Sequence, residues 1–228
     1  MSKKSDMLKF AVSGILKMTS FFVLIFLLAG RFDYWQGWVF FGIGMTAAFV
    51  ILILFRDKRD LLKERMKPGP GMKSWDKVFF AFNILFYFGI LILGPLDGGR
   101  FMLSPEIPTS IYIMGYITHA VGYVIILWAM WTNNFFSSVV RIQKDRGQKV
   151  IQNGPYQFVR HPGYIGAFLI APSSAIILGS LWSLIPAVLW VIALIIRTAL
   201  EDKTLQKELE GYKEYTKKVR YRLIPGIW

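Results

Sequence analysis

The chain has 228 residues, of which 54% are hydrophobic and 16% aromatic, and its formal net charge is +13. The apolar residues occur in blocks of about 20, which excludes an ordinary soluble domain and predicts helices that cross a bilayer. Two histidines and no cysteine argue against a disulfide framework, a thiolate metal site or a histidine metal centre, so we expect no metal. The positive charge is typical of the cytoplasmic loops of membrane proteins, and we prefer that interpretation to binding of nucleic acid.

The first half of the chain predicts four membrane spans. A basic start with Lys3, Lys4 and Lys9 precedes an apolar run at 10–29. This run is too long for a signal peptide, and no small-residue cleavage site follows it. The other apolar runs of this half predict spans at 35–55, 78–93 and 109–131.

The segment 56–77 is the first substantial polar stretch, with eight Lys or Arg residues and four acids. We expect its start to extend the second helix out of the membrane and Pro68–Gly71 to end that helix. A cytoplasmic loop touching anionic headgroups is the favoured interpretation, and a lid or substrate-entry element is the alternative. His119, inside the fourth span, is expected to make a hydrogen bond between helices.

The second half contains a long loop at 133–161 and two apolar arms at 163–178 and 181–199. The short connection at Gly179–Ser180 predicts a tight helical hairpin. A charged helical stretch at 201–218 follows. The fold expected is all-α and polytopic, with about six transmembrane helices including this C-terminal hairpin. Residues 1–132 would form the N-terminal helices with their basic loop, and 133–228 the cofactor-binding loop, hairpin and C-terminal helix, all in one integrated membrane domain.

Basic residues are distributed unevenly over the expected loops. The N-terminus, the loop at 56–77, the loop at 133–161 and the C-terminal tail hold 3, 8, 5 and 7 of them, whereas the intervening loops carry Arg31 and Arg100. The positive-inside rule then predicts that both termini and the active site are cytoplasmic.

The run Gly154–Gly166, GPYQFVRHPGYIG, concentrates polar, aromatic and turn-forming residues between apolar regions. Pro162 restricts His161 to extended conformations and suits the first position of a helix, so we expect a helix from about Pro162. The free N–H groups of that helix start favour an anion. Tyr156 and Tyr164 offer flat apolar faces with polar tips.

This run resembles the signature of the isoprenylcysteine carboxyl methyltransferases and their phospholipid methyltransferase relatives, which are membrane enzymes that use S-adenosylmethionine. The similarity extends over about 133–225, through RTALEDKTL and EGYKEYTKKV. It implies that Arg197 and Glu201 are catalytic and that Arg197 meets the acceptor. The cofactor residues implied are Arg141, Gln143, Gln148, Lys149, Val150, Ile151, Tyr156, His161, Pro162, Gly163, Tyr164 and Glu201. Gln148 stands where many relatives carry His, which makes its contact less certain.

Physical chemistry supports the same assignment independently. The two tyrosines of the run suit an adenine, and the helix start with His161 suits a carboxylate. Other interpretations remain open at this stage. Arg197 and Glu201, four residues apart, can form an ion pair on one helix face. Tyr156, Tyr164 and Tyr215 can be interface anchors, His161 a helix cap and Asp202 a solvated acid.

We therefore predict an S-adenosylmethionine-dependent membrane methyltransferase that acts on a lipid-like or prenylated acceptor and forms a carboxyl methyl ester. A carboxylate acceptor needs positioning by Arg197, whereas an amine acceptor needs a base such as Glu201 or Asp202. The alternatives are a phospholipid or lipid-amine N-methyltransferase, a sterol-reductase-like oxidoreductase that uses NADPH and, outside enzymes, a transporter or scaffold. The expected partners are the lipid bilayer and the lipophilic acceptor.

Overall fold

The computed structural model describes the backbone of residues 3–228 and the side chains at positions 12, 14, 16 and 19–228. The side chains of Lys3, Lys4, Lys9 and Lys17 lie outside the described residues. All regular structure in the described part is helical. The long helices are α1 (Lys3–Ala29), α2 (Trp35–Leu54), α4 (Ser74–Gly94), α5 (Thr109–Thr132), α6 (Pro162–Ile177) and α7 (Leu184–Glu208). The short ones are α3 (Arg59–Met66), α8 (Tyr212–Lys218), η1 (Pro95–Phe101), η2 (Lys144–Arg146) and η3 (Gly154–Gln157).

The helices are those of a polytopic membrane protein. Within the described residues, four stretches are long and apolar enough to cross a bilayer: Trp35–Leu54, Ser74–Phe101, Thr109–Thr132 and Leu184–Glu208. Two shorter apolar helical stretches are Thr19–Ala29, which is the part of α1 with all side chains described, and Pro162–Ile177, which is α6. Many large apolar side chains of these helices are exposed, as expected for surfaces that face lipid rather than water.

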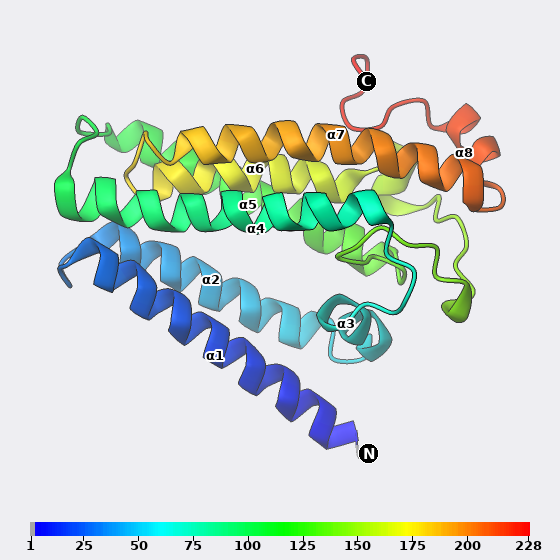
Figure 1. The fold of residues 1–228 in the computed structure, drawn as a ribbon, viewed down its shortest axis with the longest axis horizontal. Helices are drawn as coiled ribbons and strands as arrows, with labels where there is room; N and C mark the ends of the chain where they lie inside the picture. Colours follow the sequence, from blue (N-terminus) through cyan, green and yellow to red (C-terminus); the bar gives the residue numbers. More distant parts are fainter. Residues whose placement is uncertain (1–2) are drawn as a thin grey trace.

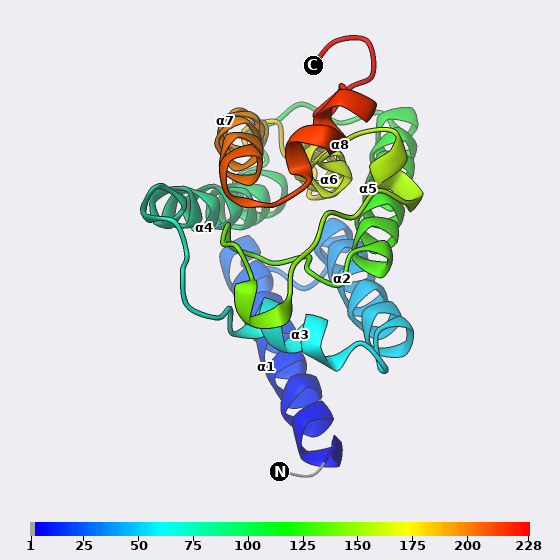
Figure 2. The same ribbon diagram turned by 90° about the vertical axis from the view of Figure 1, so that its right-hand side faces the viewer.

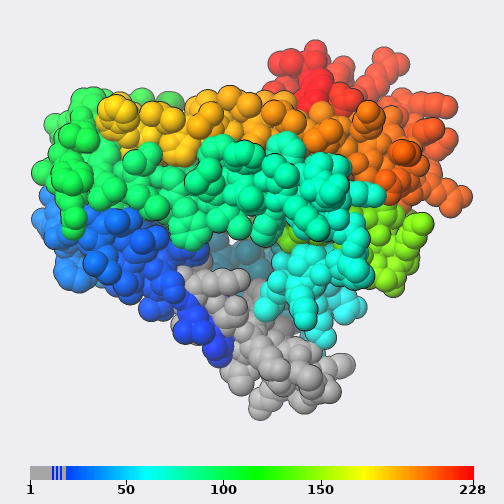
Figure 3. Space-filling model, in the orientation of Figure 1, coloured from blue at the N-terminus to red at the C-terminus, as the bar shows by residue number. Residues whose placement is uncertain are grey.

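The helices α4, α5, α6 and α7 run side by side along the longest axis, while α1 and α2 diverge from this layer (Figure 1). The view from one end shows α6 enclosed by its neighbours, with α3 beneath the layer (Figure 2). In the space-filling view, a hollow opens between α4, α1 and α3 (Figure 3). The start of α1 at Lys3 and the C-terminus lie in the half of the molecule that carries α3 and α8 (Figure 1).

The crossing of α5 and α6 depends on two glycines. A Cβ at Gly166 would lie 2.5 Å from the Gly122 carbonyl oxygen, and a Cβ at Gly122 would lie 2.8 Å from the Gly166 carbonyl oxygen. Small residues let helix backbones approach this closely in membranes, where packing rather than hydrophobic burial drives association. The predicted hydrogen bond of His119 is confirmed, since its Nδ1 lies 2.9 Å from Ser173 Oγ across the same helix pair.

The buried carboxylate of Asp97 joins several segments at the end of the molecule where the chain passes from α6 to α7. Asp97 is 3% exposed. It accepts hydrogen bonds from Ser104 N at 2.8 Å and from Ser180 Oγ at 2.6 Å. The Tyr34 hydroxyl donates to the Leu178 carbonyl in the same turn. These bonds join η1, the loop after it and the helical hairpin.

Three expectations about helix boundaries were wrong. The second helix ends at Leu54, and α3 is a separate helix rather than its continuation. Arg100, which was expected in a loop, lies in the helical turn η1. The last apolar helix does not end near 199 but runs through to Glu208. Polar side chains are tolerated in its final turns because they are paired or face the pocket instead of lipid.

We predict that Gly166→Ala destabilises the protein, because the added methyl group meets a backbone oxygen that cannot rotate away. Overpacking of this kind costs about 1–3 kcal/mol. Thermal unfolding in detergent measures the effect. Gly42→Ala is the matched control, since a Cβ there meets nothing within 4 Å. Equal melting temperatures for the two variants would contradict the close crossing.

Candidate functional site

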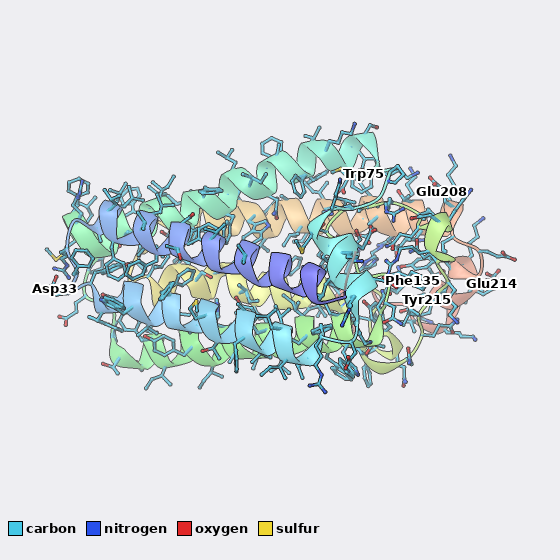
Figure 4. All side chains as sticks on the ribbon, turned by 90° about the horizontal axis from the view of Figure 1, so that it is seen from below. Asp33, Trp75, Phe135, Glu208, Glu214 and Tyr215 are labelled. Atoms are coloured by element: carbon cyan, nitrogen blue, oxygen red, sulfur yellow. The ribbon has the colours of Figure 1, made fainter. Side chains whose placement is uncertain are left out.

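The loop between α5 and α6 covers one end of the helix layer. Figure 4 shows Trp75, Phe135, Glu208, Glu214 and Tyr215 at this end, far from Asp33 at the other. The loop reverses direction at glycines with positive φ, +61° at Gly147 and +58° at Gly154, a conformation that other residues rarely adopt. These turns fold the loop back over the helix ends rather than letting it extend into solvent.

A pocket of about 310 Å³ lies beneath this loop. One face of α7 lines it with Trp190, Leu194, Arg197, Glu201 and Leu205, spaced three or four residues apart. The first two are apolar, and the next two are charged. Leu205 is apolar again, so the two charged residues of this face lie between apolar residues on both sides.

The structure brings the residues implied by the resemblance together. Except for Pro162, all of them line this pocket, including Arg197. The helix expected from about Pro162 begins there, as α6. The roles of these residues in binding cofactor or acceptor stay predictions.

Arg141 is held by carboxylates rather than left free. Its Nε and Nη2 donate to the two oxygens of Glu64, each at 2.8 Å, and its Nη1 donates to Asp145 at 2.7 Å. These hydrogen bonds lower the pKa of the Glu64 carboxyl and raise the pKa of Arg141, so both stay charged. The pair ties the loop to α3. Any contact of Arg141 with a cofactor would have to use groups other than these nitrogens.

Gln143 and Gln148 are likewise engaged within the loop. The Gln148 side-chain oxygen accepts from the Gln143 backbone N–H at 2.6 Å, and Gln143 Nε2 donates to the Phe135 carbonyl at 2.7 Å. The hydrogen-bonding capacity expected of Gln148 is thus used to shape the loop.

Asp202 is the centre of a buried network, and the interpretation of it as a solvated acid was wrong. It is 0% exposed. Arg160 binds both of its oxygens, at 2.7 and 3.0 Å, and Arg222 donates to it at 2.9 Å. A carboxylate so far from water needs such charge-assisted bonds to stay ionised. The network fastens α7 to the start of α6 and to the C-terminal segment.

His161 belongs to the same network. Its Nε2 lies 3.3 Å from Asp202 and 3.4 Å from the Tyr212 hydroxyl, and its ring stacks on Tyr164 with centroids 5.8 Å apart. His161 occupies the N-cap position of α6, but its side chain makes no capping hydrogen bond. The helix-cap interpretation therefore holds for its backbone position and not for its imidazole.

The interface-anchor interpretation was wrong for Tyr156 and Tyr215. They are 7% and 1% exposed, and the Tyr215 hydroxyl donates to the Tyr156 carbonyl at 2.7 Å. Asn133 donates to the Tyr156 hydroxyl at 3.2 Å. Burial raises the pKa of both phenols, which keeps them neutral.

Arg197 pairs with a residue that the sequence analysis did not single out. Its Nε and Nη2 lie 2.8 and 3.2 Å from the two oxygens of Asp76, in the first turn of α4. The ion pair considered within α7 is replaced by this one, while Glu201 accepts a hydrogen bond from the Tyr164 hydroxyl. In the sequence, Asp76 is an acid next to the start of an apolar span. That position does not distinguish a solvated acid from a buried one, because the partner comes from a distant helix.

Comparisons with known proteins show what this chain is similar to. Residues 110–211 match the model of a family described as phospholipid methyltransferase. A protein-S-isoprenylcysteine O-methyltransferase of Schizosaccharomyces pombe is 25% identical over 201 residues, which cover 80% of this chain and 84% of the relative.

Two sterol reductases are also similar. A probable 7-dehydrocholesterol reductase of Acanthamoeba polyphaga mimivirus is 27% identical over 174 residues, covering 69% of this chain and 37% of the relative. A Delta(14)-sterol reductase of Mus musculus is 26% identical over 177 residues, covering 69% of this chain and 42% of the relative. The chain thus spans less than half the length of either reductase. The resemblance found in the sequence is confirmed: residues 110–211 of this polytopic membrane protein match the phospholipid methyltransferase family model, and the isoprenylcysteine O-methyltransferase is similar over most of both chains.

Proposed function

We propose that the protein is an S-adenosylmethionine-dependent methyltransferase that esterifies a carboxylate on a lipid-like or prenylated acceptor. The observation that carries this proposal is the face of α7 described above. Its apolar part, Trp190 and Leu194, suits a hydrocarbon tail, and its charged part, Arg197 and Glu201, suits a polar headgroup. The similarity to an isoprenylcysteine O-methyltransferase over most of both chains supports the same reading.

The pocket residues fit the proposed cofactor. S-adenosylmethionine supplies a methyl group already activated by a sulfonium, together with an adenine, a ribose and an amino-acid group. The rings of Tyr156 and Tyr164 line the pocket and can contact the adenine, and the Glu201 carboxylate can accept hydrogen bonds from hydroxyl or amine groups. The loop residues Gln148, Lys149, Val150 and Ile151 form the wall beside them.

The protein's own task is to align the acceptor and to exclude water. The hydrogen bonds of Arg197 described above use Nε and Nη2. Its Nη1 is then the nitrogen with which we expect it to orient a carboxylate oxygen of the acceptor. A carboxylate is already deprotonated, so this reaction needs no base.

Methylation of a lipid amine is the second candidate, and one observation favours it. Asp76 already compensates the charge of Arg197, so the negative charge of Glu201 dominates this part of the pocket. An amine acceptor arrives protonated and needs a base, for which Glu201 is suited. Asp202 is not, because two arginines hold it ionised and fully buried.

A sterol-reductase-like activity is the third candidate, favoured by the two reductase similarities. It requires NADPH in place of S-adenosylmethionine, so direct binding of the two labelled cofactors separates it from both methyltransferase candidates.

We further infer that α1 and α6 join the four long apolar stretches as membrane spans, six in all. Six crossings bring both termini to one side, and the loop charges make that side cytoplasmic. The regions 1–132 and 133–228 would form one integrated domain, which the contacts of Glu64 and Asp76 with the second region support.

The proposed reaction predicts transfer of a labelled methyl group from S-adenosylmethionine to a farnesylated N-acetylcysteine by the purified protein in nanodiscs. The product should release the label as methanol on mild base treatment, as esters do. Phosphatidylethanolamine is the parallel amine probe. A base-stable product from that lipid alone would favour the second candidate, and binding of NADPH without binding of S-adenosylmethionine would exclude both.

Arg197→Ala should lower turnover of the carboxylate probe while cofactor affinity stays nearly unchanged. The expected loss is on the order of 2–4 kcal/mol of transition-state stabilisation, as for removal of one oriented donor. Arg197→Lys should also be poor, because an ammonium lacks the planar fork that binds Asp76 and the acceptor together. Full activity of Arg197→Ala would rule out the carboxylate role and leave Glu201 as the position to test.

Reporter fusions test the inferred topology. Reporters after Lys67 and after Trp228 should read cytoplasmic, and one inserted near Leu96 should read external, because basic loops are retained on the cytoplasmic side. A cytoplasmic signal at Leu96 is incompatible with six crossings.

A further inference from the structure

Asp76 lies outside residues 110–211, which match the family model, yet it is completely buried and paired with a residue of the proposed site. We propose that Asp76 is a positioning residue: it holds the Arg197 guanidinium in place beside the pocket and keeps Arg197 from pairing with Glu201. This inference rests on the proposed function, in which Arg197 meets the acceptor.

The geometry fixes the plane of the guanidinium. Asp76 binds the Nε–Nη2 edge of Arg197 with two bonds, and Nη2 also donates to the Ser138 carbonyl at 2.9 Å. The Tyr164 ring lies 5.7 Å from the centre of the guanidinium. Two parallel bonds to a planar fork leave little rotational freedom. The Nη1 end is thereby fixed relative to the pocket that Arg197 lines.

Asp76 is itself immobilised. One of its oxygens accepts from the Val140 backbone N–H at 2.6 Å, and the Lys73 N–H donates to the Val140 carbonyl at 3.0 Å. The start of α4 therefore binds both the backbone N–H and the backbone carbonyl of Val140, in the loop over the pocket. A carboxylate held in this way can orient a long, flexible arginine side chain without moving with it.

Glu201 is the partner that Arg197 would otherwise choose. The two residues are four apart on one face of α7, the spacing at which opposite charges pair, and both line the pocket. An Arg197–Glu201 pair would occupy both side chains inside the site. With Asp76 present, Glu201 instead receives the Tyr164 hydroxyl and keeps its charge available to the pocket.

A purely structural role is the rival explanation, because an acid in the first turn of a helix stabilises the helix dipole. Asp76→Asn removes the charge on which both explanations depend, so a double-mutant cycle with Arg197→Ala separates them: a loss of helix-dipole stabilisation is the same with and without the Arg197 side chain. Asparagine retains one oxygen, which can still accept from Val140 N–H and from Nη2 of Arg197, but it loses the charge and presents an N–H donor where the other oxygen accepts from Nε. The variant thus preserves the tie between α4 and the loop and removes the charged, two-bond clamp on the guanidinium.

The experiment is a double-mutant cycle of Asp76→Asn and Arg197→Ala in nanodiscs, with labelled S-adenosylmethionine and the probe, farnesylated N-acetylcysteine or phosphatidylethanolamine, that the protein methylates. Asp76→Asn should lower kcat/KM for the acceptor about 30- to 100-fold, since misplacement by about 1 Å has such an effect. In the Arg197→Ala background, it should add less than about threefold, because residues that act through one another are not additive.

Glu208→Gln is the matched control, because it breaks a nearby ion pair between the same two helices. Glu208 binds Lys73 at 2.6 Å at the rim and does not line the pocket. Its loss should leave kcat/KM within about twofold, as for other partly exposed pairs. Equal losses from Asp76→Asn in both backgrounds would overturn the inference, as would an Asp76→Asn enzyme with unchanged kcat/KM.

Chemical labelling provides a readout that needs no turnover. Phenylglyoxal modification of Arg197, followed by mass spectrometry with Arg146 as the internal reference, should be faster in Asp76→Asn, because a guanidinium freed from its carboxylate is more reactive. An unchanged rate would overturn the clamp even if neither acceptor probe is methylated. Faster labelling combined with a fully active Arg197→Ala variant would keep the clamp and reject the proposed role of Arg197.

Discussion

Burial of charge at the end of a membrane helix bundle is the constraint on which the rest of this structure depends. A carboxylate removed from water is tolerated only when cations or N–H groups replace the lost hydration. Glu64, Asp76 and Asp202 each meet this requirement with an arginine that binds both carboxylate oxygens. Removal of one partner from such a pair leaves an uncompensated charge, so these pairs fix the geometry around the pocket more firmly than apolar packing alone.

The three pairs connect segments that are distant in the sequence. Glu64 brings α3 to the loop after α5, Asp76 brings the start of α4 to α7, and Asp202 brings α7 to the loop before α6 and to the C-terminal segment. Each pair therefore contributes one wall of the pocket. The N-terminal region supplies two of the three acids, which explains how a part of the chain without a recognisable motif takes part in shaping the site.

The pocket also illustrates how a membrane protein combines two environments. Along the pocket-lining face of α7, the charged residues Arg197 and Glu201 lie next to the apolar residues Trp190 and Leu194, so one helix face presents both apolar and charged groups to the pocket. Charge interactions are stronger next to apolar groups than in bulk water. The pairing of Arg197 with Asp76 lowers the positive charge that Arg197 presents to the pocket, because a compensated arginine is a weaker site for an anion than a free one.

Structural elements that depend on local patterns could be predicted from the amino-acid sequence. Apolar blocks of bilayer length predicted helices close to their observed positions, and Pro162 marked the start of α6. The motif and its flanks predicted residues that line one pocket. The roles of those residues rest on resemblance and are not decided by their position.

The partners of the charged groups, in contrast, follow from the tertiary structure alone. The sequence favoured a solvated Asp202 and an interface position for Tyr215, and both are buried. It gave no indication of the partner of Asp76, because a buried pair between residues 121 positions apart leaves no periodic pattern in the sequence. Local periodicity reports which face of a helix is apolar, whereas the partner of a buried charge depends on which helices pack together.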